Sequence, residues 1–184
     1  MKLSKRGEYA LRALIDLGIA QELGRPLLRI SELVEKEKLP ENFLVQILVQ
    51  LRAAGIVEAK RGKHGGYSLA RPMNEVNFGQ VVRLIDGPLA PIACVSQTAY
   101  ARCTCPDEAH CGLRMLMLDV RNAIANVLDR YTLADIVEVT LRKLRRDNAS
   151  FHLGDVCPLP FDVDTPERPA TGSAKPVRRI VTRR

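Results

Sequence analysis

The chain is poor in aromatic residues. Its 184 residues include no tryptophan, and aromatic residues make up only 4% of the sequence. Hydrophobic residues in total reach 46%, which is enough to build a buried core. We therefore expect a core of aliphatic side chains, in one domain or in a small domain with an appendage.

Long hydrophobic runs are also missing. No apolar stretch approaches the roughly 20 residues that a transmembrane helix needs. The first residues are basic, but neither an uninterrupted apolar stretch nor a small-residue cleavage site follows them. We therefore expect no signal peptide, no membrane partner and a cytoplasmic protein.

Basic residues outnumber acidic ones. Lysine and arginine total 28 against 21 acidic residues, which gives a formal net charge of +7 and a pI near 9.4. The surplus lies near the two ends of the chain, and the middle is close to neutral. This distribution favours an acidic partner, and nucleic acid is the first candidate.

The first part of the chain combines three predicted helices with a predicted hairpin. Apolar residues recur at helical spacing over 4–22, 31–36 and 41–54. Strand-like segments follow at 56–60 and 67–70, joined by a basic, glycine-rich turn. This order of elements is that of a winged helix-turn-helix, so the fold class is mostly α with a small β-hairpin.

Two groups of side chains in this part are suited to DNA. A helix with short polar side chains four residues apart can enter the major groove, and a basic hairpin tip can contact phosphate. The alternative is that the hairpin charges are ordinary solvated turn residues, but their place behind three helices favours double-stranded DNA as the partner. The candidate DNA-binding residues are Asn42, Gln46 and Gln50 on the third helix, and Arg61, Lys63 and His64 in the turn.

Three further helices are predicted after the hairpin, at 78–86, 112–131 and 133–145. The middle one carries apolar residues at alternating intervals of four and three, as in a coiled-coil seam. We interpret it as the dimerisation helix of a homodimer; the alternative is packing within its own chain. The seam residues are Leu113, Met117, Val120, Ile124, Val127 and Tyr131.

The last segment differs from the rest. Residues 146–184 are rich in proline and basic residues and contain few apolar ones, which predicts a disordered tail. The predicted organisation is a DNA-binding domain over 1–72, a cysteine loop with dimerisation helices over 73–145, and the tail over 146–184.

Four of the five cysteines fall between two predicted helices: Cys94, Cys103, Cys105 and Cys111. Their neighbours are mostly polar, which argues against a role in the hydrophobic core. Disulfides conflict with the expected cytoplasm. Clustered thiolates bind zinc, copper(I) or iron–sulfur centres. Because the gaps of eight, one and five residues do not form two close pairs, the spacing favours an iron–sulfur cluster over structural zinc. Cys157, in the tail, is a bystander.

Three motifs resemble the Rrf family of winged-helix transcription regulators, whose iron–sulfur members are the IscR, NsrR and RirA types. The first helix matches in Leu3-Ser4-x-x-Gly7-Glu8-Tyr9-Ala10-Leu11-Arg12-Ala13-Leu14. The third helix matches from Phe43 to Val57, and the hairpin matches in Arg61-Gly62-x-x-Gly65-Gly66-Tyr67-x-Leu69. The resemblance covers about residues 1–140 and implies a homodimer that binds DNA. The chain departs from the family at Val45, where many members carry a polar base-reading residue.

The resemblance also implies a [2Fe–2S] or [4Fe–4S] cluster bound by three cysteines of the loop. Cys105 and Cys111 match the family's last two ligands, and Cys94 is the favoured first ligand although it lies further upstream than usual; Cys103 is its substitute. Some relatives use a histidine where this chain has Arg114. Others recruit an acidic residue from the partner's first helix, which makes Glu8 of the partner subunit a candidate fourth ligand. Its competitors are His110 and Cys103.

The predicted function is that of a sequence-specific transcription regulator whose DNA affinity is set by an iron–sulfur cluster that senses iron, nitric oxide or redox state. The alternative is the same regulator without iron, in which the cysteines bind structural zinc or act as a thiol redox switch. An enzyme is disfavoured, because the sequence has no glycine-rich phosphate loop after a strand and no defensible Ser/His/Asp grouping.

Overall fold

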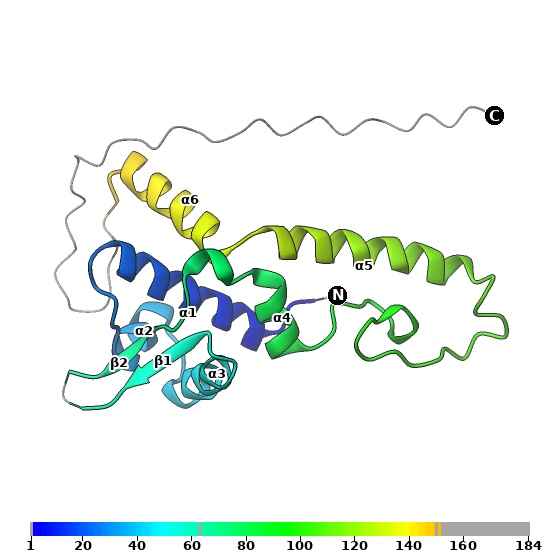
Figure 1. Cartoon of the computed structure of the whole chain (residues 1–184), viewed down its shortest axis with the longest axis horizontal. Helices are drawn as coiled ribbons and strands as arrows, with labels where there is room; N and C mark the ends of the chain where they lie inside the picture. Colours follow the sequence, from blue (N-terminus) through cyan, green and yellow to red (C-terminus); the bar gives the residue numbers. More distant parts are fainter. Residues whose placement is uncertain (1, 63, 150, 152–184) are drawn as a thin grey trace.

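The computed structural model describes residues 2–62, 64–149 and 151 (Figure 1). These residues form six α-helices, two 3₁₀ turns and one antiparallel hairpin. The helices and the hairpin were predicted from the sequence with nearly the same bounds, whereas the two 3₁₀ turns were not predicted. The helices are α1 (Lys5–Glu22), α2 (Ile30–Glu37), α3 (Glu41–Ala53), α4 (Phe78–Asp86), α5 (Gly112–Arg130) and α6 (Leu133–Arg146). The turns are η1 (Met73–Glu75) and η2 (Ala93–Val95), and the strands are β1 (Val57–Lys60) and β2 (Gly66–Leu69).

One aliphatic core joins the N-terminal helices to α4 and α6. Leucine, isoleucine, valine and alanine side chains supply nearly all of it, in agreement with the low aromatic content. Helix α6 returns to the body and packs against α1, where a Cβ on Gly18 would lie 2.7 Å from Val137 Cγ2. The core side chains of α1, α3 and α6 include Ala13, Leu14, Leu17, Leu44, Ile47, Leu48, Leu51, Leu133, Val137 and Leu141.

The start of α1 is joined to the end of α4. The Ser4 hydroxyl caps α1 by accepting a hydrogen bond from the backbone N–H of Gly7 at 3.0 Å. The backbone N–H of Ser4 in turn donates to Asp86 Oδ2 at 2.8 Å. A Cβ on Gly7 would lie 2.6 Å from that carboxylate oxygen, so glycine allows the close approach of the two helices.

The wing is anchored by a contact that the sequence did not predict. Leu28, in the connection between α1 and α2, exchanges two backbone hydrogen bonds with Tyr67 of β2, at 3.0 and 2.7 Å. A Cβ on Gly66 would lie 2.4 Å from the Leu28 carbonyl oxygen, and one on Gly65 would lie 2.2 Å from that of Lys60. The two glycines therefore allow the close backbone contacts at the turn end of the hairpin, where Gly66 pairs with Lys60.

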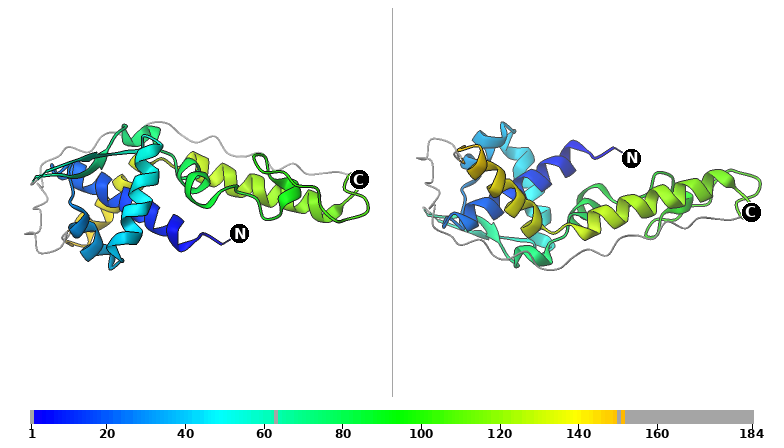
Figure 2. Two further views of the ribbon diagram at one scale, coloured as in Figure 1. Left: turned by 90° about the horizontal axis from the view of Figure 1, so that it is seen from below. Right: turned by 90° about the horizontal axis from the view of Figure 1, so that it is seen from above.

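Helix α5 projects from the body, and the segment between α4 and α5 runs beside it (Figures 1 and 2). Its base is fixed by Arg83 of α4, which donates two hydrogen bonds to the carboxylate of Asp129 at 2.7 and 2.6 Å. A Cβ on Gly79 would lie 1.9 Å from Asp129 Oδ1, so a larger residue at this position would force the carboxylate to shift from where it binds Arg83. Within the described ranges, no helix is both long and apolar enough to cross a bilayer.

The predicted disordered tail lies outside the described residues from position 152 onward, and Cys157 lies there too. Phe151, the last described residue, is buried against the body. Lys36 Nζ lies 3.6 Å from the centroid of its ring. The chain beyond α6 is therefore joined to α2 by a cation–π contact.

A buried ionic cluster connects α1 to α2. Asp16 of α1 forms an ion pair with Lys36 of α2, and Glu37 of α2 forms one with Arg12 of α1. Burial raises the pKa of Asp16 from 3.8 to about 7; the charge of Lys36 opposes this rise, and the neighbouring Glu37 adds to it. The native state therefore binds a proton at Asp16 that the unfolded chain releases at a lower pH.

The raised pKa predicts how Asp16 affects stability. Between about pH 4 and pH 7 only the native state keeps this proton, so the contribution of Asp16 to the free energy of unfolding falls as the pH rises. The Asp16→Asn variant lacks that contribution. Its free energy of unfolding, measured with urea, should therefore fall less between about pH 5 and about pH 8 than that of the parent protein. Glu22→Gln, at an exposed position of the same helix, is the matched control. An equal loss in Asp16→Asn and the parent would contradict the assignment.

Candidate DNA-binding surface and cysteine loop

The exposed face of α3 carries two of the three predicted polar residues. Asn42 and Gln46 are exposed, whereas Gln50 is half-buried and its Oε1 atom has no hydrogen-bond partner among the described residues. Val49, which is 52% exposed, occupies the next position along the face of Asn42 and Gln46. The face available to a DNA groove is thus Asn42, Gln46 and Val49. The apolar member was not predicted, because an apolar side chain at helical spacing gives no sign of base contact.

An aromatic pair fixes the start of α3 against α1. The rings of Tyr9 and Phe43 lie edge to face, with centroids 5.9 Å apart and an interplanar angle of 88°. They line an open hollow together with Pro40, Asn42 and Gln46. The two polar side chains are therefore presented beside a rigid aromatic support.

The wing presents the other predicted DNA-binding residues. Arg61 and His64 are exposed in the turn between β1 and β2, while Lys63 lies outside the described residues. Gly62 has a φ of +113°, which favours glycine at the tip. An exposed arginine at the end of a hairpin can reach a phosphate that lies beside the groove entered by the neighbouring helix.

The two ends of the cysteine loop are held by α5. Cys94 lies buried in η2, and its carbonyl oxygen accepts a hydrogen bond from Arg114 Nε at 3.3 Å. The next carbonyl, that of Val95, accepts one from Arg121 Nη1 at 2.8 Å. At the other end, Cys111 caps α5 by accepting the backbone N–H of Arg114 at its sulfur, 3.4 Å away. Helix α5 therefore positions both Cys94 and Cys111.

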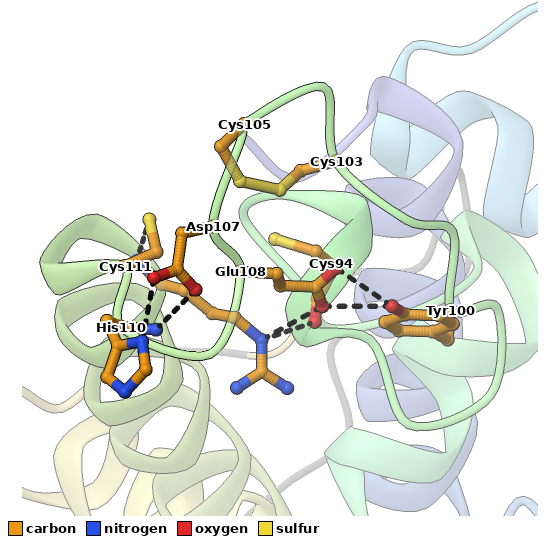
Figure 3. Close-up of a disulfide and its surroundings, with 9 residues drawn as sticks. Cys94, Tyr100, Cys103, Cys105, Asp107, Glu108, His110 and Cys111 are labelled. Carbon is orange, nitrogen blue, oxygen red and sulfur yellow. Dashed lines mark hydrogen bonds and ion pairs between the residues drawn. A yellow bond between two sulfur atoms is a disulfide. The ribbon is translucent and has the colours of Figure 1, made fainter.

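The middle of the loop is joined by a disulfide between Cys103 and Cys105, whose Cα atoms are 5.4 Å apart (Figure 3). Among the described cysteines, Cys94 and Cys111 are free thiols. The predicted cluster ligands thus share one loop, but in the described part of the chain no three His, Cys, Asp or Glu side chains converge as a metal site. The sulfur donors suit an iron–sulfur cluster in kind, provided that Cys105 is reduced.

Polar contacts between side chains also hold the loop together. The Tyr100 hydroxyl donates to Glu108, whose carboxylate oxygens lie 2.9 and 3.0 Å away, and this hydrogen bond raises the pKa of Tyr100. Glu108 also lies 3.3 Å from Arg114 Nε (Figure 3). His110, a competing ligand candidate, is exposed, and its Nδ1 lies 2.7 Å from Asp107 Oδ2. Its hydrogen bond lowers the pKa of Asp107.

Glu8, the predicted fourth ligand, lies in the first turn of α1 and not in the loop. Its carboxylate is 2.8 Å from Lys5 Nζ and 3.5 Å from Arg12 Nη1. The hydrogen bond from Lys5 lowers the pKa of Glu8, so the side chain is ionised at neutral pH. These ion pairs are exposed, which makes them weak and easily exchanged for another partner.

The described residues thus form a winged helix-turn-helix, with an arginine at the tip of its hairpin and a cysteine loop beside a long helix. The sequence pattern of Rrf2, described as an iron-dependent transcriptional regulator, matches residues 3–139. The chain belongs to the Rrf2 family. Rrf2 proteins are transcriptional regulators and not enzymes, in agreement with the sequence-based prediction.

Relatives within the Rrf2 family support this assignment. The chain is 38% identical over 137 residues to an Rrf2-like HTH-type transcriptional regulator of Rhodobacter capsulatus, covering 73% of this chain and 91% of that protein. It is 41% identical over 86 residues to the regulator IscR of Cereibacter sphaeroides, covering 47% and 56%. The structure of CymR, the global cysteine regulator of Bacillus subtilis, superposes with a TM-score of 0.63 at 28% identity, covering 76% and 98%.

The DNA-binding surface predicts two different mutational effects. Gln46→Ala should weaken binding to a preferred operator by about 1–3 kcal/mol and affect random DNA less, because base contacts carry specificity. Arg61→Ala should weaken binding to both and lower the slope of log affinity against log salt by about one, because one phosphate contact is lost. Fluorescence anisotropy at several salt concentrations measures both effects.

Two exposed positions away from this surface provide matched controls. Gln21→Ala on α1 and Arg145→Ala on α6 make the same chemical changes as Gln46→Ala and Arg61→Ala. Both should bind operator like the parent. If Gln46→Ala and Arg61→Ala also bind like the parent, α3 and the wing do not contact DNA as described.

Proposed function

We propose that this Rrf2 protein is a cytoplasmic homodimer that binds operator DNA through α3 and the wing, and that its affinity is set by an iron–sulfur cluster in the loop between η2 and α5. The observation that carries the proposal is the attachment of this loop to α5 through Arg114 and Arg121. A change in the loop is thereby connected to the helix that we assign to dimerisation.

The ligands we assign from this chain are Cys94, Cys105 and Cys111. Cys94 and Cys111 are held at the two ends of the loop by the hydrogen bonds of α5, and Cys105 lies between them. A cluster bound there would supply a centre whose integrity depends on iron supply, nitric oxide or oxidants. Because thiolate is the ligating form of cysteine, Cys105 must be released from Cys103 before it can take part.

Exposure of the seam residues supports dimerisation through α5. Within a single chain no residue of α5 is fully buried, and four of the six seam residues are exposed while the other two are half-buried. Leu113 is 59% exposed and Val127 is 51% exposed, and Val120 and Tyr131 are exposed as well. A second copy packed along this seam would remove these apolar side chains from water. Two recognition helices would then be held at a spacing that depends on the α5 pair.

Glu8 of the partner subunit remains our proposed fourth ligand. The carboxylate is ionised, and exposed ion pairs with Lys5 and Arg12 hold it. A carboxylate is a harder and weaker ligand for iron than a thiolate, so such a site would lose this ligand readily. That property suits a sensor, because a free-energy difference of a few kcal/mol between two forms of the dimer is enough to change the occupancy of its DNA site strongly.

Anaerobic isolation tests the cluster assignment. The purified protein should be brown, with visible charge-transfer bands and stoichiometric iron and sulfide. Cys105→Ser should abolish these bands, whereas Cys157→Ser, in the tail, should keep them. Glu8→Ala should leave a dimer whose cluster has an altered spectrum and a shorter lifetime, because one ligand is lost.

Two outcomes would contradict these assignments, one for the cluster and one for its fourth ligand. A colourless protein that contains zinc would contradict the iron–sulfur proposal while leaving the family and DNA binding intact. If Glu8→Ala keeps the spectrum and lifetime of the parent while His110→Ala or Cys103→Ala changes them, the assignment of Glu8 is wrong.

A further inference from the structure

The disulfide divides the cysteines of the loop into two pairs with different chemistry. Cys103 and Cys105, separated by Thr104, are joined to each other, whereas Cys94 and Cys111 are free thiols. Both sulfurs of the bonded pair belong to half-buried residues, so a small thiol can reach them. In Figure 3 the bonded pair lies at the outer bend of the loop, away from Tyr100 and His110.

The rest of the loop is held by contacts that do not involve this disulfide. Arg114 binds the carbonyl of Cys94 and the carboxylate of Glu108, and Tyr100 binds the same carboxylate. Cys111 is fixed as the cap of α5. Residues 101–106 form neither helix nor strand. Opening the disulfide would therefore release the short segment that carries Cys105 while both ends of the loop stay in place.

We propose that Cys103 and Cys105 form a redox-active dithiol whose disulfide withholds Cys105 from metal binding. Cys103 acts as the bonding partner of Cys105 and is not a ligand. This inference rests on the proposed function only in naming Cys105 as a ligand. With the disulfide closed, the described loop offers two thiols, fewer than the three that the site needs; with it open, Cys105 becomes available as a thiolate.

The reaction is a thiol–disulfide exchange with a low-molecular-weight disulfide. During closure, the thiolate of one cysteine attacks the small disulfide and forms a mixed disulfide, and one small thiolate leaves. The second cysteine then attacks the bonded sulfur, the Sγ–Sγ bond forms, and the second small thiolate leaves. The two cysteines lose two protons and two electrons, and the small disulfide is reduced to two thiols. Reversible bonds of this kind are the usual role of disulfides in a reducing compartment.

Binding of cobalt(II) to the full chain tests this proposal. Cobalt(II) alone is the probe, because it reports thiolate ligation by a charge-transfer band and needs no sulfide, which would itself reduce the disulfide. The chain is reduced with a phosphine or oxidised with diamide, freed of reagent and titrated anaerobically. Oxidation should lower the titratable thiols from five to three, and cobalt binding should weaken at least about tenfold.

Three variants make the test specific. Cys103→Ser, which has no partner for Cys105, should bind cobalt like the reduced parent both before and after diamide treatment. Cys157→Ser should keep the oxidant sensitivity of the parent. In Cys105→Ser, reduced protein should bind cobalt weakly, and diamide should have no further effect.

Several results would overturn the proposal. One is that the oxidised parent protein binds cobalt as tightly as the reduced parent protein. Another is that the new disulfide maps to cysteines other than Cys103 and Cys105. Loss of cobalt binding in reduced Cys103→Ser would make Cys103 a ligand and not only a bonding partner. If reduced Cys105→Ser binds cobalt like the parent, the ligand assignment of the proposed function fails instead, while thiol counting and mapping still decide whether the dithiol exists.

Discussion

The apolar surface of α5 sets the main physical constraint on this molecule. The helix projects from the body, and within a single chain none of its residues is fully buried, although its seam carries leucine, methionine, valine and isoleucine. Full burial of such a side chain contributes about 1.5–3 kcal/mol, so the seam favours pairing with a second apolar surface. The Arg83–Asp129 pair and the glycine at position 79 fix the base of α5, which determines where that surface is presented.

The same helix also organises the cysteine loop. Arg114 and Arg121 extend from α5 to two adjacent carbonyls of η2, and Cys111 caps its first turn. The cysteine loop and the proposed dimer contact therefore both lie on α5. A change in the loop would act directly on this helix, without a long chain of contacts between separate sites. On the other side of the loop, Asp86 at the end of α4 accepts a hydrogen bond from the backbone N–H of Ser4, next to the turn of α1 that carries Glu8. Helix α4, which precedes the loop in the sequence, is thus joined to the DNA-binding body by this hydrogen bond.

Most of the fold could be predicted from the sequence, because helical periodicity, caps such as Ser4 and breakers such as Gly87-Pro88 act locally. Contacts between distant segments could not be predicted in this way. The bridge between Leu28 and Tyr67, the packing of α6 on α1, and the ionic cluster around Asp16 each join parts with no shared local pattern. In the candidate site, the exposed Asn42 and Gln46 followed from spacing alone. The pairing of Cys103 with Cys105 was not predicted, because the expected cytoplasm argues against stable disulfides, and the alternative of a thiol redox switch named no bonded pair.

Sedimentation velocity of seam variants tests most directly whether α5 pairs with α5 of a second copy. Val120→Asp and Ile124→Asp each place a charge in the apolar seam, where an unpaired charge is strongly unfavourable. Asn126→Asp adds the same charge at an exposed position off the seam and serves as the control. We expect the parent and the control to sediment as dimers and both seam variants to sediment as folded monomers that no longer bind operator. Dimers in both seam variants would contradict the claim and place the interface on another surface.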